Sequence, residues 1–188
     1  MIEALPIREL PIGELIQALA QRTSTPGGGA AAALTAALGC AAGAMAARYT
    51  DGPKYAGVAA AAAHLANLLD AAASDCLRLA TEDADSYAAV RAAKVTKNAA
   101  NIAEAERQAA QVPAELLATC AIHARTLATF APDCNRWLLS DVQVGVHLLA
   151  GAGRAAMRTL AVNNPDAEIL AVARAHVTAL ADAESALD

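Results

Sequence analysis

Apolar positions recur along most of the chain every three to four residues, which is the spacing of α-helices. The pattern predicts a first helix over 11–22, with Ile12, Leu15, Ile16 and Leu19 on one face. Further helices are predicted over about 28–49 and from the turn at 50–55 to about 94. A fourth helix follows the polar segment 94–101 and ends at about 127, a fifth runs from about 140 to 162, and the last ends at about 186. Strand-like runs of β-branched and aromatic residues are missing. We therefore expect an all-α multihelical bundle forming a single domain over residues 1–188.

The predicted helix over 28–49 is apolar or small on every face. Such a helix is buried, either in lipid or in the centre of a protein. Its length is close to that of a membrane span. However, its alanines, glycines and threonine make it only weakly hydrophobic, and no aromatic belt flanks it. We expect a central helix wrapped by the others, and no membrane association.

Prolines and polar segments divide the other helices. Pro113 falls inside the fourth predicted helix, so we expect that helix to be kinked or broken there. The polar segment 94–101 and the loop 130–137 separate neighbouring helices. Asn164 followed by Pro165 is typical of an N-cap with proline at the first helical position.

Composition narrows the classes of function. Hydrophobic residues make up 56% of the chain and aromatic residues only 3%, so close helix contacts must be numerous or completed by a second subunit. The formal charge of −5 and the lack of a Lys/Arg cluster argue against nucleic-acid binding. The N-terminus has no apolar signal-peptide core, so we expect a cytoplasmic protein. The cysteines have no metal-ligand spacing and are expected to be buried, reduced thiols. They are Cys40, Cys76, Cys120 and Cys134.

Three glycines precede the central helix. The Gly27–Gly29 turn leaves free backbone N–H groups at a helix N-terminus, where an anion or a carbonyl oxygen can bind. The turn has neither the Gly-Lys-Ser/Thr of a phosphate loop nor a preceding strand, so it is not a nucleotide-binding motif. A tight entry turn into the core would explain the same residues.

Acidic and basic side chains supply further candidates. Asp83, Tyr87 and Arg91 share one helical stripe, and the stripe places Asp83 at the edge of the core. A half-buried carboxylate needs either an ion-pair partner or a ligand. Asp141, after Ser140, opens a later helix, where both residue types also serve as ordinary caps.

The order of these motifs resembles the cyclodeaminase/cyclohydrolase family of one-carbon folate metabolism, over roughly residues 11 to 170. That family includes the C-terminal domain of formiminotransferase-cyclodeaminase and stand-alone methenyltetrahydrofolate cyclohydrolases. The motifs that carry the resemblance are Thr25-Pro26-Gly27-Gly28-Gly29, Lys54-Tyr55, Asp83-Ala84 with Tyr87, Val112-Pro113, Asn135, Ser140-Asp141 and Asn163.

The resemblance implies a dimeric, all-helical enzyme that acts on tetrahydrofolate derivatives without a metal or another cofactor. It implies catalytic roles for Asp83, Asp141 and Lys54. The substrate-binding residues that it implies are Pro26, Gly27, Gly28, Gly29, Tyr55, Tyr87, Asn135, Ser140 and Asn163. The expected reaction is hydrolysis of 5,10-methenyltetrahydrofolate to 10-formyltetrahydrofolate. The alternatives are formimidoyltetrahydrofolate cyclodeamination and folate or partner binding without catalysis.

Some positions depart from the family pattern. The usual Gly-Lys-Lys-Lys-Tyr is replaced by Asp51-Gly52-Pro53-Lys54-Tyr55, which would weaken binding of a polyglutamate tail. Trp137 stands where a second asparagine is common, and Ala30 stands where a serine often follows the glycines. Near the end of the late helix, Thr159 replaces the first of two asparagines.

Overall fold

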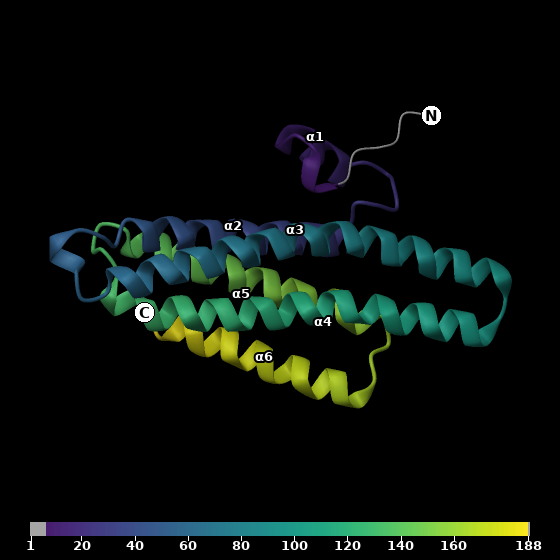
Figure 1. Ribbon diagram of the computed structural model, residues 1–188. Helices are drawn as coiled ribbons and strands as arrows, with labels where there is room; N and C mark the ends of the chain where they lie inside the picture. Colours follow the sequence, from purple (N-terminus) through teal and green to yellow (C-terminus); the bar gives the residue numbers. More distant parts are fainter. Residues whose placement is uncertain (1–6, 188) are drawn as a thin grey trace.

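The computed structural model describes residues 7–187, and in this range the chain forms six α-helices and no strand (Figure 1). Residues 1–6, part of the stretch examined for a signal peptide, lie outside the described range. The helices are α1 (Ile12–Leu19), α2 (Gly28–Arg48), α3 (Ala59–Thr96), α4 (Ala99–Phe130), α5 (Leu139–Val162) and α6 (Ala167–Ser185). Short 3₁₀ turns lie at Ile7–Glu9, Pro53–Tyr55 and Ala131–Asp133. The predicted all-α fold is confirmed.

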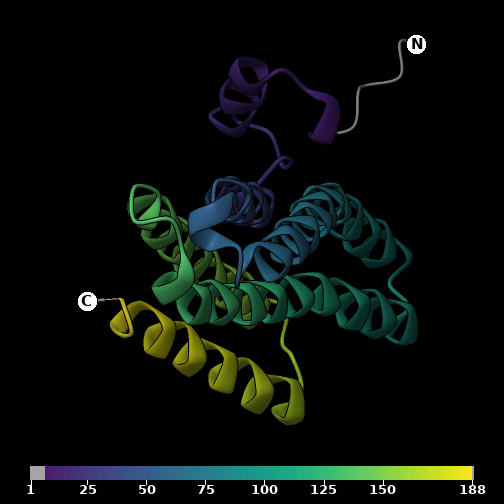
Figure 2. The ribbon, with the colours of Figure 1, turned by 60° about the vertical axis from the view of Figure 1, so that its left-hand side comes forward.

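Most residues of helix α2 are buried, as its apolar pattern predicted, but Leu38 and Met45 are 56% and 39% exposed, so the other helices cover only part of its circumference. It packs chiefly against α3 and α5, and Figure 2 shows it beside both. The backbones of α2 and α5 touch, because a Cβ built on Gly39 would lie 2.9 Å from the carbonyl oxygen of Gly145. Among residues 7–187, α2 alone is long and apolar enough to cross a membrane, with a mean hydropathy of 1.7, and 61% of that window is buried inside the bundle. Its apolar character therefore has an explanation in core packing.

Helix α4 runs without interruption through Pro113, so of the two predicted outcomes, a kink or a break, the break is wrong. Proline lacks the N–H that would normally bond to the carbonyl four residues earlier, here that of Ala109. The Nδ2 of Asn163, at the end of α5, donates to that carbonyl oxygen at 3.2 Å. The tertiary contact supplies the missing donor, and a long helix can continue past a buried proline.

Some predicted boundaries also need correction. α3 continues to Thr96 and α4 begins at Ala99, so the polar connection shrinks to two residues. It is this short because Lys97 adopts a left-handed conformation and Asn98 caps α4. At the other end of the bundle, α6 is capped by Asp166, whose Oδ1 accepts from the Ile169 N–H at 2.8 Å. The predicted N-cap at Asn164 is therefore wrong, because the chain needs a left-handed residue there before it can turn into α6.

The core contains all four cysteines as free, buried thiols, which confirms that prediction. Aliphatic side chains of α3 and α5 pack against the small residues of α2, and the core continues through α4 to α6. Helix α1 covers part of the outer side of this core with Leu15, which is buried, whereas Ile12 and Ile16 are 70% and 63% exposed. The short α1 therefore leaves an apolar surface beside α2.

Candidate functional site

A cavity of about 400 Å³ lies where the N-terminal end of α2 meets α3, α4 and the end of α5. Its volume is within the range of small-molecule sites. It is lined by Ser24, Thr25, Gly27, Gly28, Gly29, Asp83, Ser86, Tyr87, Val90, Lys94, Glu106, Ala109, Thr159, Val162 and Asn163. Six of the residues predicted for the site are in this wall: Gly27, Gly28, Gly29, Asp83, Tyr87 and Asn163. Pro26 adjoins it after a cis peptide bond.

The carboxylate of Asp83 is seated on the first turn of α2. The backbone N–H of Ala30 donates to Asp83 Oδ2 at 3.1 Å. A Cβ built on Gly29 would overlap the carboxyl group, lying 2.6 Å from Oδ2 and closer still to Oδ1. Only glycine therefore leaves room for the carboxylate at this helix end. The glycine turn does serve as an entry into the core, and its third glycine also makes space for an acidic side chain.

The environment of Asp83 changes its acidity. Burial raises the pKa of Asp83 above its ordinary value, and the hydrogen bond from Ala30 lowers it in part. The positive end of the α2 dipole also lies beside this carboxylate. A carboxyl group with a raised pKa, open to a cavity, is suited to exchange protons with a ligand.

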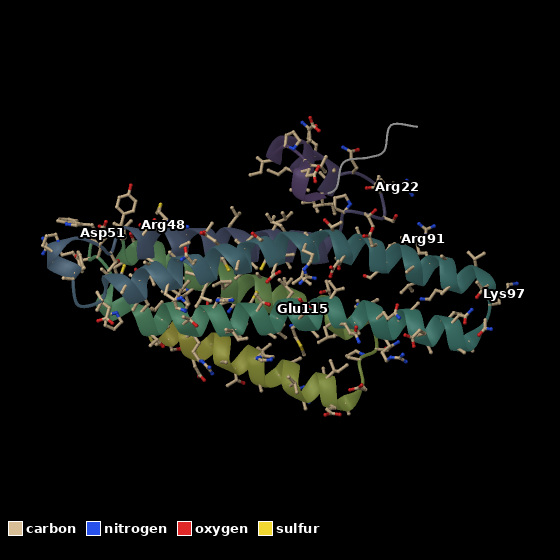
Figure 3. The ribbon with its side chains drawn as sticks, in the orientation of Figure 1. Arg22, Arg48, Asp51, Arg91, Lys97 and Glu115 are labelled. Atoms are coloured by element: carbon tan, nitrogen blue, oxygen red, sulfur yellow. The ribbon has the colours of Figure 1, made fainter. Side chains whose placement is uncertain are left out.

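Charged and polar residues of α3 and α4 form the rim of the cavity. Lys94 Nζ lies 3.1 Å from Glu106 Oε1, which links the two helices. Arg91, labelled in Figure 3, donates to Ser24 Oγ at 3.5 Å. Tyr87 is 47% exposed, so its ring lies at the mouth of the cavity. These residues give the rim both cationic and anionic groups.

Asn163 contributes an oriented amide to the opposite wall. Its Nδ2 donates to Ala109 O, and a carbonyl oxygen can only accept, so the orientation of the amide is fixed. Among residues 7–187, no hydrogen bond to Asn163 Oδ1 is formed. This oxygen is an acceptor for a ligand N–H in the cavity.

The other predicted site residues lie at the opposite end of α2, about 30 Å away by the rise of an α-helix. This distal group comprises Lys54, Tyr55, Asn135, Ser140 and Asp141. Figure 3 shows the separation, with Asp51 next to the distal group and Arg91 near the cavity.

Asn135 links Tyr55 of the distal group to the C-terminal end of α2. Tyr55 Oη donates to Asn135 Oδ1 at 3.2 Å, and Asn135 Nδ2 donates to the carbonyl of Tyr49 at 2.9 Å. Lys54 Nζ lies 5.2 Å from the centre of the Tyr55 ring. Trp137, the departure from the family pattern, is 74% exposed here and does not line the Asp83 cavity. Within one subunit, therefore, the distal group cannot reach a ligand held by Asp83.

The sequence alone left several wall residues unidentified. Ser86, Val90 and Lys94 continue the stripe of Asp83 at helical spacing, so inclusion of the i+3, i+7 and i+11 positions would have found them. Glu106 and Ala109 had no such signal, because only the packing of α4 against α3 and α5 brings them to the cavity. In the described part of the chain, no group of three His, Cys, Asp or Glu side chains is arranged to hold a metal ion.

Comparisons with known proteins agree with this architecture. The profile of the family described as formiminotransferase-cyclodeaminase matches residues 11–178. The crystal structure of formiminotetrahydrofolate cyclodeaminase from Thermotoga maritima superimposes with a TM-score of 0.82 at 22% sequence identity. That match covers 96% of this chain and 91% of the other, and at this identity it shows a shared fold. No curated protein sequence matches the chain.

Proposed function

The chain belongs to the formiminotransferase-cyclodeaminase family, and from this premise we propose that it is a folate enzyme that hydrolyses 5,10-methenyltetrahydrofolate to 10-formyltetrahydrofolate. The observation that carries the proposal is the half-buried Asp83 carboxylate, held by Ala30 N–H in a cavity of suitable size. The proposal includes a single domain, a cytoplasmic location and no cofactor other than the folate substrate.

The chemistry requires a base close to an electrophilic carbon. The methenyl bridge is an amidinium, so a nearby carboxylate stabilises its positive charge. Asp83 takes a proton from the attacking water as the C–O bond forms. A proton is then delivered to N5 as the C–N5 bond breaks, and the hydroxyl proton of the adduct leaves to solvent. The raised pKa of Asp83 suits both accepting a proton and returning it.

We propose further that the enzyme is a homodimer built across α1 and α2. The support is an apolar surface of exposed side chains, which we call the α1–α2 face: Ile12, Ile16, Leu38, Met45 and Tyr49. Contiguous exposed apolar surface of this kind marks interaction sites. An isologous dimer with antiparallel α2 helices would bring the distal group of each subunit toward the cavity of the other. Residues about 30 Å apart in one chain would then contribute to one site.

Formimidoyltetrahydrofolate cyclodeamination is the second candidate, favoured by the structural likeness to a formiminotetrahydrofolate cyclodeaminase. The same carboxylate would move protons while N10 attacks and ammonia leaves. Binding without catalysis is the third, and the single Lys54 of the distal group favours it, because the lysine cluster typical of the family is absent from the sequence.

Two activity assays and a binding measurement separate these candidates. We expect purified protein to accelerate the loss of 5,10-methenyltetrahydrofolate absorbance, and Asp83→Asn to abolish most of that acceleration. Asp85→Asn is the matched control, because Asp85 lies on the same helix but is exposed and outside the cavity wall. Ammonia release from 5-formiminotetrahydrofolate without methenyl turnover would establish the deaminase instead. Folate binding with neither reaction would establish the non-catalytic binder.

A further inference from the structure

We propose that Pro113 is a positioning residue: by removing one N–H from α4, it leaves the Ala109 carbonyl free to hold the Asn163 amide in the wall of the cavity. The link between Pro113 and Asn163 follows from the structure itself. Its importance for ligand binding rests on the proposed folate function.

The hydrogen-bond pattern of α4 is the first step. In an α-helix, the N–H of residue 113 would bond to the carbonyl of residue 109. Proline has no N–H, and its ring pushes the carbonyl four residues earlier out of line. Both Ala109 and Pro113 are buried, so solvent does not satisfy that carbonyl. A buried carbonyl without a hydrogen-bond donor destabilises the folded state, so a donor from elsewhere in the chain is needed.

Asn163 is the donor that the fold provides. It is the C-cap residue of α5, where the chain leaves the helix, and the next residue adopts a left-handed conformation. A side chain at such a helix end would ordinarily sample several rotamers. The 3.2 Å bond from Nδ2 to Ala109 O ties it to a buried part of α4 instead. The bond also fixes which way the amide faces.

The consequence is a preorganised acceptor. With Nδ2 turned toward α4, Asn163 presents Oδ1 to ligand N–H groups, and the amino group and ring N–H of a pterin are such donors. Binding then costs less ordering of the side chain, so the effect of Pro113 is expected in ligand affinity. A proline with a purely structural role would affect folding stability instead.

The first measurement requires no ligand. The side-chain amide signal of Asn163 is identified in a ¹H–¹⁵N NMR spectrum by its loss in Asn163→Asp. In Pro113→Ala, the restored N–H of residue 113 competes for Ala109 O, and we expect the Asn163 signal to shift and broaden. Pro132→Ala, in the 3₁₀ turn at Ala131–Asp133, is the control and should leave this signal unchanged. An unchanged signal in Pro113→Ala would overturn the proposal.

The second measurement is a double-mutant cycle with 5-formyltetrahydrofolate as the probe. We expect Pro113→Ala and Asn163→Ser each to weaken its affinity about 3- to 10-fold, the range of one hydrogen bond. The double variant should lose no more than Asn163→Ser alone. Pro113→Ala should keep its Tm within about 4 °C of wild type, because alanine is the better helix former.

The outcomes keep the two proposals separate. Additive losses in the double variant, or a large fall in Tm with unchanged affinity, would assign Pro113 a structural role only and overturn the inference. A wild-type protein that binds no folate would contradict the proposed function. The NMR comparison would still decide whether Pro113 positions Asn163.

Discussion

The Asp83 carboxylate occupies the space that any side chain at Gly29 would need. Ala30 N–H donates to Oδ2 at 3.1 Å, and a Cβ on Gly29 would lie 2.6 Å from that same oxygen. The glycine and the carboxylate are therefore one structural unit, although they lie 54 positions apart in the sequence. Substitution of either residue is expected to change the position or the environment of the other.

Gly29→Ala should damage the site while Gly151→Ala does not. An alanine at 29 forces Asp83 or the start of α2 to move, and overpacking of this kind costs about 1–3 kcal/mol. Gly151 lies in α5 outside the cavity wall and a Cβ there meets nothing within 4 Å, so Gly151→Ala is the matched control. Thermal melting and folate affinity measure both effects. Equal stability and affinity of the two variants would show that Asp83 has room to move away.

Asp83→Asn should stabilise the protein at neutral pH and remove its activity. Burial raises the pKa of Asp83 in the folded chain, so between the ordinary value of 3.8 and that raised pKa the folded chain binds more protons than the unfolded one. Stability contributed by Asp83 is therefore present at low pH and is lost as pH rises through this window. The asparagine keeps an acceptor for Ala30 N–H without the buried charge. Urea unfolding at several pH values measures the difference, and a wild type more stable than Asp83→Asn at pH 7 would contradict it.

Activity that depends on ionised Asp83 has the opposite pH dependence. If the carboxylate is the base, kcat/KM should rise with pH through the raised pKa and then level off. The rise should be missing from the residual activity of Asp83→Asn and present in Asp85→Asn. A wild-type profile that falls across the same window would indicate that the protonated acid is the active form.

Leu38→Glu should convert the proposed dimer into monomers. Leu38 is 56% exposed on the α1–α2 face, and a buried, unpaired carboxylate at an interface is strongly unfavourable. Val95→Glu is the control, because Val95 is 82% exposed near the far end of α3. Light scattering coupled to size-exclusion chromatography measures the mass. A wild-type monomer, or a dimer that persists in Leu38→Glu, would rule out dimerisation through this face.

Complementation tests whether the two ends of α2 serve one site. Asp83→Asn and Asp141→Asn change residues in the cavity and in the distal group, respectively. If the subunits share sites, equal mixing of these inactive variants after dissociation should restore about one quarter of wild-type activity, because half of the random dimers have one intact site. Absence of recovery, with subunit exchange shown by mass, would confine the chemistry to one subunit.

Features that depend on residues close together in the sequence were predictable, and features that depend on residues far apart in the sequence were not. The spacing of apolar residues and the alanine content predicted the helices and the buried α2, because local propensity and amphipathicity determine both. The stripe of Asp83, Tyr87 and Arg91 was visible for the same reason. In contrast, Pro113 predicted a kink or a break in α4. The break does not occur, because the donor that satisfies the Ala109 carbonyl comes from Asn163, 54 positions away.

The sequence by itself determined the helical class, the largely buried helix α2 and the residue types available for proton transfer, since each depends on neighbours within a few turns. Only the tertiary structure decided which of these residues meet. Packing of α2 against α3 places Asp83 over Gly29, and the end of α5 brings Asn163 to the same cavity. The length of α2 keeps Lys54 and Asp141 about 30 Å from that cavity within one subunit. The local pattern predicts the length of α2, but which motifs gather at each of its ends depends on how α3, α4 and α5 pack against it.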